Sequence, residues 1–237
     1  MRPMFSYFGS KWNLAKRYGA PMHGLVIEPF AGSAAYSLYW NAPKVLLIDA
    51  FPEIVGMWQF LIRASEREIR SLPLDFDHVD DLKIPQEAKW LIGYWIKKAS
   101  VTGGKSRTAW ARQYRHSGDC KVWGEAARER IASQLVGIRD WKALLGDWSS
   151  APDVEATWFI DPPYQVAGKH YVFSSVDYDA LATFSRSRQG QIFVCENAGA
   201  NWLPFRPLHN SRGTFGHKRS GVSMEVVCCV QNNSNRL

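Results

Sequence analysis

Residues 25–49 read LVIEPFAGSAAYSLYWNAPKVLLID, and this stretch decides the fold. Two short apolar runs, 25–27 and 45–48, end in the carboxylates Glu28 and Asp49. Apolar runs without polar alternation are typical of parallel strands that are buried on both faces. Small residues follow the first run and lead into a helix-like segment before the second run begins. The stretch therefore predicts a strand–helix–strand unit.

The rest of the chain repeats this alternation of strands and helices. The apolar runs that predict further strands are 157–160, 191–195 and 224–230. The segments that predict helices are 53–64, 86–99, 124–136 and 140–145. We therefore expect an α/β fold with a mostly parallel, doubly wound sheet and helices on both faces, which binds ligands at the carboxyl ends of its strands.

The positive charge of the chain is concentrated in one segment. The 237 residues carry a formal net charge of +7, which fits either a polyanionic partner or an ordinary basic surface. Thirteen lysines and arginines stand against five acidic residues between positions 83 and 142, so this segment carries +8 and the remainder −1. We predict a core of residues 1–60 and 143–237 and an inserted basic lobe of residues 61–142.

Several functional classes lack their motifs. The four cysteines have no C-x-x-C spacing and the six histidines form no H-x-E or H-E-x-x-H pattern, so no metal site is expected. The absence of G-x-G-x-x-G argues against a nicotinamide enzyme, and Ala99 stands where a P-loop needs glycine. No apolar run reaches the roughly 18 to 20 residues that cross a membrane. We expect a cytoplasmic protein with reduced thiols.

The strongest chemical motif is Asp161-Pro162-Pro163-Tyr164, directly after the apolar run at 157–160. Two prolines stiffen the loop and leave carbonyl oxygens free to accept hydrogen bonds from a ligand. The Asp161 carboxylate and the Pro162 carbonyl suit the two hydrogens of an exocyclic amino group, and Tyr164 can stack on a planar base. An acidic turn ended by prolines is the structural alternative.

A second set of residues suits a nucleoside cofactor. Asp49 lies at the end of a strand, where a carboxylate can accept hydrogen bonds from both hydroxyls of a ribose. A turn or helix cap is its alternative role. The small residues 31–33 allow close approach of the backbone to a ligand and place helix-start amides toward it.

These motifs, together with Tyr7-Phe8-Gly9-Ser10-Lys11, resemble those of the Dam-type (class alpha) DNA adenine N6-methyltransferases. The resemblance extends from about residue 4 to residue 230 with the motifs in the family's order, although Gly9-Ser10 stands where relatives often have two glycines. It implies a Rossmann-like methyltransferase fold and S-adenosyl-L-methionine as cofactor, with S-adenosyl-L-homocysteine as product and no metal. The implied reaction is in-line methyl transfer to the N6 amino group of a flipped adenine in double-stranded DNA.

The resemblance also implies roles for individual residues. The catalytic residues are expected to be Asp161, Pro162, Pro163 and Tyr164. The expected cofactor contacts are Tyr7, Lys11, Glu28, Pro29, Phe30, Gly32, Ser33, Asp49, Asp147 and Asp161. The ring of Tyr7 would pack on the ligand, and the Lys11 ammonium would meet its carboxylate. An aromatic staple with a surface lysine, and a polar turn at Asp147, are the structural alternatives.

The basic lobe is expected to contact DNA. The predicted contacts are Lys105, Arg107, Arg112 and Arg115, which are interleaved with Trp110 and Tyr114. Such a mixture suits phosphate neutralisation combined with groove or base contacts, although a single arginine alone would equally suit a solvated face.

Three alternative functions stay open at this point. An N4-cytosine DNA methyltransferase must likewise hold an exocyclic amino group by hydrogen bonds. A non-catalytic DNA-binding protein could share the fold. RNA could replace DNA as the substrate. The protein is expected to be a monomer or weak dimer, encoded by a bacterium or phage.

Overall fold

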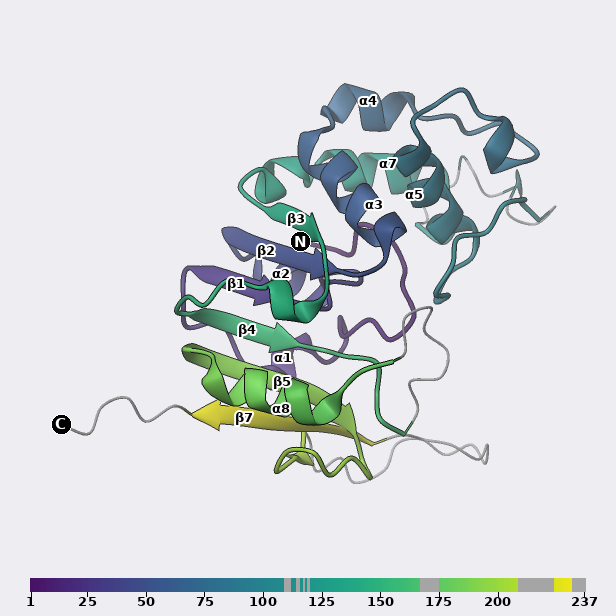
Figure 1. The fold of residues 1–237 in the computed structure, drawn as a ribbon. Coiled ribbons are helices and arrows are strands. Elements are labelled where there is room, and N and C mark those ends of the chain that lie inside the picture. Colours follow the sequence, from purple (N-terminus) through teal and green to yellow (C-terminus); the bar gives the residue numbers. More distant parts are fainter. Residues whose placement is uncertain are drawn as a thin grey trace.

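The computed structural model describes residues 1–108, 112, 113, 116, 118, 120–166, 175–208 and 224–231. Its strands form one sheet in the order β3-β2-β1-β4-β5-β7-β6, in which β1 to β5 are parallel and β7 is antiparallel to both β5 and β6 (Figure 1). The strands are β1 (Leu25–Glu28), β2 (Lys44–Asp49), β3 (Lys142–Leu145), β4 (Ala156–Ile160), β5 (Gly190–Asn197), β6 (Arg206–Pro207) and β7 (Glu225–Gln231). The expected Rossmann-like, mostly parallel sheet is confirmed.

Helices cover both faces of the sheet. The helices are α1 (Ala15–Tyr18), α2 (Ala35–Trp40), α3 (Pro52–Arg63), α4 (Glu66–Ser71), α5 (Gln86–Ile96), α7 (Glu125–Ala132) and α8 (Tyr178–Ser187). The described residues also form the 3₁₀ turns η1 (Val79–Asp81) between α4 and α5, η2 (Leu135–Ile138) between α7 and β3, and η3 (Trp148–Ser150) between β3 and β4. Because strand side chains alternate between faces, Trp158 packs with α8 on one face while Phe159 packs with α2 on the other. No helix within the described ranges is long and apolar enough to span a bilayer.

The helix predicted over residues 140–145 is wrong. This segment forms β3, which pairs with β2 at the edge of the sheet. Its apolar residues misled the prediction because Leu144 and Leu145 are exposed at that edge rather than buried on a helix face. The helix predicted to reach Ala99 ends earlier, at Ile96, and Ala99 itself has a positive φ of 50°. Helix α8 and strand β6 were not predicted.

The order of the strands fixes where a ligand can bind. Chain connections run outward from β1 to β2 and β3 on one side, and from β4 to β5 on the other. Doubly wound sheets bind ligands at the carboxyl ends of the strands, where the strand order reverses. Here that point lies between β1 and β4, which places Glu28 and Asp161 at the same edge.

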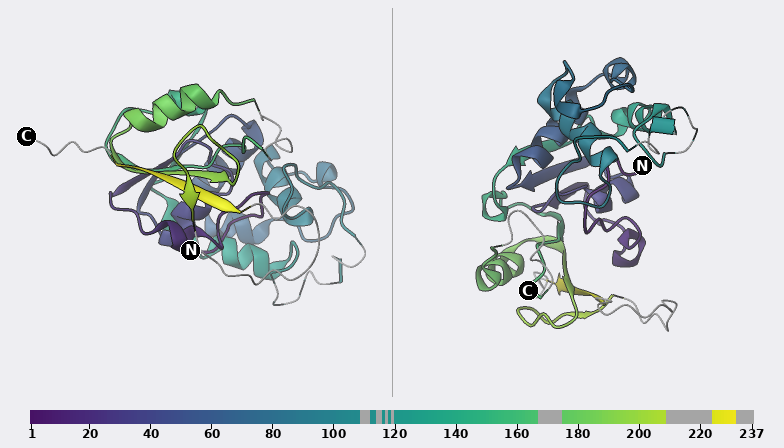
Figure 2. Two further views of the ribbon diagram at one scale, coloured as in Figure 1. Left: turned by 90° about the horizontal axis from the view of Figure 1, so that it is seen from below. Right: turned by 90° about the vertical axis from the view of Figure 1, so that its right-hand side faces the viewer.

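The helical lobe shares one hydrophobic core with the sheet. Figure 2 shows α4, α5 and α7 gathered at the β3 end of the sheet, away from α8. A continuous cluster of buried side chains runs from Phe159 of β4 through Trp58 of α3 to Trp95 and Trp123. The predicted domain boundary after residue 60 falls inside α3, which packs against both parts. The division into core and lobe stays a prediction.

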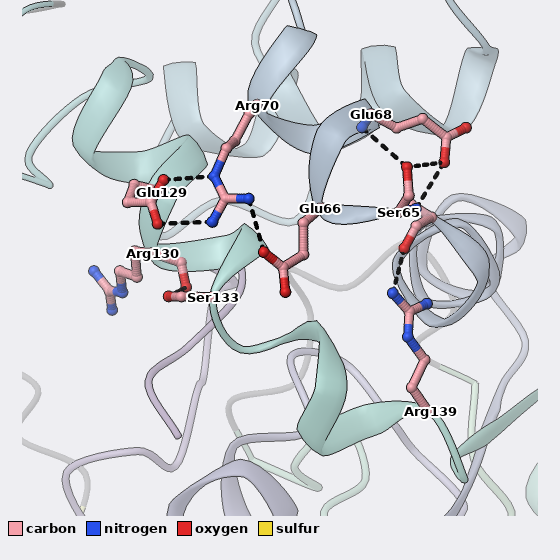
Figure 3. Close-up of polar contacts among 9 residues, drawn as sticks. Ser65, Glu66, Glu68, Arg70, Glu129, Arg130, Ser133 and Arg139 are labelled. Carbon is pink, nitrogen blue, oxygen red and sulfur yellow. Dashed lines mark hydrogen bonds and ion pairs between the residues drawn. The ribbon is translucent and has the colours of Figure 1, made fainter.

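Polar contacts tie the outer helices of the lobe together (Figure 3). Arg70 of α4 donates to both carboxylate oxygens of Glu129 in α7, at 2.7 and 2.9 Å, and to Glu66 at 2.7 Å. Ser65 and Glu68 form a capping box at the start of α4. A cap of this kind stabilises a helix by about 1 kcal/mol, and exposed ion pairs contribute less. The buried apolar cluster is therefore the main source of the lobe's stability.

A close approach of two backbone segments inside the lobe leads to a testable prediction. Gly93 of α5 lies against the 103–104 segment, where an added Cβ would be 2.9 Å from the Gly104 carbonyl oxygen. Gly93→Ala should lower the free energy of unfolding by about 1–3 kcal/mol, because backbone cannot move aside as a flexible side chain can. Gly24→Ala is the matched control, since a Cβ there meets nothing within 4 Å. Equal stability of the two variants in urea denaturation would contradict this packing.

Candidate active site

A cavity of about 270 Å³ opens at the carboxyl ends of the strands around the point of reversal. It is lined by all ten residues predicted as cofactor contacts: Tyr7, Lys11, Glu28, Pro29, Phe30, Gly32, Ser33, Asp49, Asp147 and Asp161. Of the other predicted catalytic residues, Pro163 also lines the cavity, whereas Pro162 and Tyr164 are not among its lining residues. The structure thus brings the sequence-predicted residues into one site, while their individual roles stay predictions.

The loop between β1 and α2 forms one wall through an unusual backbone conformation. Gly32 has a φ of +43°, and a Cβ there would be 3.1 Å from the ring of Tyr7. Ala34 is also left-handed, with a φ of 46°. The Gly32 carbonyl accepts a hydrogen bond from the Trp58 indole at 2.9 Å. The chain is therefore held close under the Tyr7 ring, which a larger residue at position 32 would prevent.

Asp49 supports this loop and still faces the cavity. Its Oδ2 accepts from the Gly32 amide at 3.0 Å, and its Oδ1 accepts from the Phe51 amide at 2.9 Å. Burial raises the pKa of the carboxyl, and these two backbone hydrogen bonds partly offset the effect. Each carboxylate oxygen can accept more than one hydrogen bond. The structural role and the predicted ribose contact are therefore compatible.

Glu28 ends β1 as a buried carboxyl group. It is only 2% exposed, and its Oε1 accepts a hydrogen bond from the Ser37 amide at 3.0 Å. Burial raises the pKa of Glu28 to about 8, and the nearby negative charge of Asp161 adds to the rise. At neutral pH this side chain is therefore mostly a neutral acid.

Asp161 meets a buried lysine at the cavity wall. The Nζ of Lys11 lies 3.0 Å from Asp161 Oδ1, donates to the Gly9 carbonyl at 2.9 Å and lies 4.7 Å from the ring centroid of Tyr164. Burial raises the pKa of Asp161 to about 6, although the Lys11 ammonium opposes that rise. Lys11 was expected to meet a cofactor carboxylate, but here its ammonium pairs with the motif's own acid.

Three side chains around this lysine have the chemistry of metal ligands. Ligand atoms of Asp161, Cys195 and Glu225 lie within 4.8 Å of one another, the one such group found in the described part of the chain. The Lys11 ammonium already supplies positive charge to both carboxylates, at 3.0 and 3.7 Å. Burial raises the pKa of the Cys195 thiol well above its usual range, which keeps it protonated. The group therefore fits a lysine-centred polar cluster better than a metal site.

Residues outside the motifs hold the loop that begins at Asp161. The Tyr178 hydroxyl of α8 donates to the Pro163 carbonyl at 2.9 Å. The buried Glu196 of β5 accepts from the Gln165 amide at 2.8 Å and from the Trp202 indole at 3.1 Å. The one sequence signal for Glu196 is its position at the end of an apolar run.

Asp147 has a structural role at the cavity. Its Oδ1 accepts from the Ser149 amide at 2.8 Å, which caps η3. The polar-turn alternative is therefore correct for its local geometry. Because Asp147 and Trp148 both line the cavity, contact with a cofactor stays a prediction for this residue.

The predicted DNA contacts are in different environments. Arg107 is 4% exposed, donates to the Leu74 carbonyl and lies over the Phe76 ring, so it is a buried structural residue and the predicted phosphate contact needs correction. Lys105 and Arg112 are exposed and pair with Asp80 at 2.6 Å and Asp77 at 3.0 Å. Arg115, Trp110 and Tyr114 lie outside the described residues.

Residues 7–88 match the model of a family described as D12 class N6 adenine-specific DNA methyltransferase. This part of the chain is similar to that family. The match includes the Tyr7–Lys11 motif, the loop under Tyr7 and Asp49, and it ends before Asp161. The resemblance and the adenine-specific DNA methyltransferase class predicted from the sequence are confirmed. No curated protein matches the chain.

The buried Glu28 of the methyltransferase makes stability depend on pH. Its folded pKa of about 8 exceeds its ordinary value of 4.5, so its contribution to stability is full below about pH 4.5 and is lost as the pH rises through about 8. Glu28→Gln keeps an acceptor for the Ser37 amide and removes the titration. Between about pH 5 and 8, wild type should lose about 2–4 kcal/mol of unfolding free energy relative to this variant. Parallel pH profiles of the two proteins in urea denaturation would contradict the prediction.

Proposed function

We propose that this methyltransferase transfers a methyl group from S-adenosyl-L-methionine to the N6 amino group of adenine in double-stranded DNA. The target base is flipped out of the helix, because N6 must reach Asp161 at the wall of the cavity. The observation that carries the proposal is the convergence of Glu28, Asp49 and Asp161 on one cavity, with the proline-rich loop at its wall. The match of residues 7–88 to an adenine-specific family supports adenine over cytosine as the base.

The side chains that line the cavity match the chemical groups of S-adenosyl-L-methionine. Asp49 has spare acceptor capacity for ribose hydroxyls, and Phe30 and Phe51 supply apolar surface for an adenine ring or a thioether chain. The ionised Asp161 and the dipole of the buried Glu28 favour a positively charged sulfonium nearby. When bound, this cofactor supplies an electrophilic methyl group. Because the methyl donor carries its own activation, the proposal needs no metal.

Asp161 performs the central task at the base. Its carboxylate and the Pro162 carbonyl accept the two N6 hydrogens, which turns the nitrogen lone pair toward the methyl group. These hydrogen bonds strengthen as positive charge develops on the nitrogen, so they favour the transition state over the ground state. The bound cofactor would supply the methyl group and leave as S-adenosyl-L-homocysteine, and the proton that N6 loses would pass to the Asp161 carboxylate that accepts its hydrogen bond. Orientation by a stiff loop supplies much of the rate.

The exposed basic residues of the lobe contact the DNA backbone. Lys105 and Arg112 pair with aspartates in the free protein, and pairs as exposed as these contribute little to stability because water screens them. Phosphates can therefore replace these aspartates at small cost. Arg107 has no part in this contact, because its guanidinium is buried under Phe76.

The role of Asp161 is tested by Asp161→Asn. The variant should lose at least about a hundredfold in kcat, because the amide accepts a hydrogen bond from N6 more weakly than a carboxylate. Asp140→Asn, an exposed acid, is the matched control. Mass spectrometry of nucleosides from DNA treated with the enzyme measures the product. Wild-type turnover in Asp161→Asn would refute the role of Asp161. N4-methylcytosine as the product would show that the target base is cytosine and not adenine.

The DNA surface is tested by a double variant, Lys105→Ala with Arg112→Ala. It should weaken DNA binding and reduce the steepness of its salt dependence, because each lost phosphate contact lowers the slope by roughly 0.9. Lys44→Ala with Lys142→Ala removes the same charge at the amino ends of β2 and β3 and is the control. If both double variants weaken DNA binding equally in titrations at several salt concentrations, the surface is misassigned.

A further inference from the structure

Glu225 is the first residue of β7, far from every motif in the sequence. In the antiparallel register it lies opposite Asn197 of β5, and its carbonyl accepts from the Leu208 amide at 3.1 Å. Its backbone is therefore held between two neighbouring segments. Its side chain lies in the polar cluster around Lys11 and is about one-fifth exposed.

A single oxygen of this carboxylate meets three donors. Glu225 Oε1 accepts from the Tyr18 hydroxyl at 2.8 Å and from the Tyr164 hydroxyl, and it lies 3.7 Å from the Lys11 ammonium. The donors come from α1, the catalytic loop and the first motif. A carboxylate that only stabilised the strand would not need to join these three segments.

This contact fixes the free end of Tyr164. The backbone of the loop is already held by Tyr178 at the Pro163 carbonyl. The hydroxyl bond to Glu225 fixes the far end of the ring, and Lys11 lies 4.7 Å from the ring centroid. A tyrosine has two side-chain torsions, so anchoring its hydroxyl as well as its backbone leaves the ring one orientation. A base that stacks on this ring finds it preorganised.

We propose that Glu225 is a positioning residue that sets the ring plane of Tyr164 for the flipped target base. The inference rests on the proposed function, in which Tyr164 stacks on that base. Glu225 is not among the residues that line the cavity, and its contact with the Tyr164 hydroxyl is the route by which it acts on the base. Loss of the carboxylate should impair base placement and leave cofactor binding intact.

The first experiment separates kcat from cofactor affinity. Glu225→Ala should lower kcat by about tenfold and change the KM for S-adenosyl-L-methionine by less than about twofold, because a misplaced stacking partner affects reaction geometry. Glu225→Gln should recover most of the loss, since its amide oxygen still accepts the hydroxyl. Glu155→Ala removes an exposed glutamate before β4 and is the matched control.

The second experiment tests the route through Tyr164. Tyr164→Phe removes only the hydroxyl and should reproduce the effect of Glu225→Ala, and the double variant should be no worse than either single one. The position that the wild-type protein methylates is mapped first. DNA that carries 2-aminopurine at that position then reports stacking of the base through its fluorescence. Both single variants should change that fluorescence in the bound complex, whereas the Glu155 control should match wild type.

Each outcome has a definite meaning. Wild-type kcat and fluorescence in Glu225→Ala, or additive effects in the double variant, would overturn the positioning role and leave the proposed function standing. If Glu225→Ala does not fold, unchanged kcat and fluorescence in Tyr164→Phe would overturn it instead. A wild-type protein that methylates no DNA would overturn the proposed function, and the positioning role with it.

Discussion

A buried cation between two carboxylates is the interaction around which the site is organised. Lys11 as a whole is 6% exposed, and its ammonium lies between Asp161 and Glu225 and beside the Tyr164 ring. Burying charges is costly unless they are paired and hydrogen-bonded, so Asp161 at 3.0 Å and Glu225 at 3.7 Å both offset the burial of the Lys11 ammonium. The N-terminal segment, the loop that begins at Asp161 and β7 each supply one charged group to this cluster.

The same pairing sets the protonation states across the cavity wall. Two carboxylates close to one ammonium leave excess negative charge, and burial raises the pKa of Asp161 to about 6. The pKa of Glu28 is raised further because burial acts there without a close cation, so one acid stays ionised at neutral pH while its neighbour is mostly neutral. Environment thus gives two similar side chains different tasks.

The sequence was informative where function depends on short contiguous motifs. The strands that end at Glu28, at Asp49 and just before Asp161 were predicted because their apolar runs are uninterrupted, and a parallel sheet brings their ends together. Glu225 and Tyr178 could not be predicted, because they reach the loop through an antiparallel register and a helix that leave no local pattern. Arg107 was misjudged because charge indicates exposure on average, whereas its guanidinium finds a carbonyl and an aromatic face inside the lobe.

The hydrophobic cluster that the lobe shares with one face of the sheet has a consequence for how such a protein could diverge. Because the buried cluster passes without a break from the sheet through α3 into α5 and α7, the lobe cannot be exchanged as an independent cassette. A graft cut at residue 60 would divide a helix and expose Leu61 together with the partners of Trp58. Substitutions on the lobe's outer surface therefore disturb the fold less than replacement of the lobe as a unit.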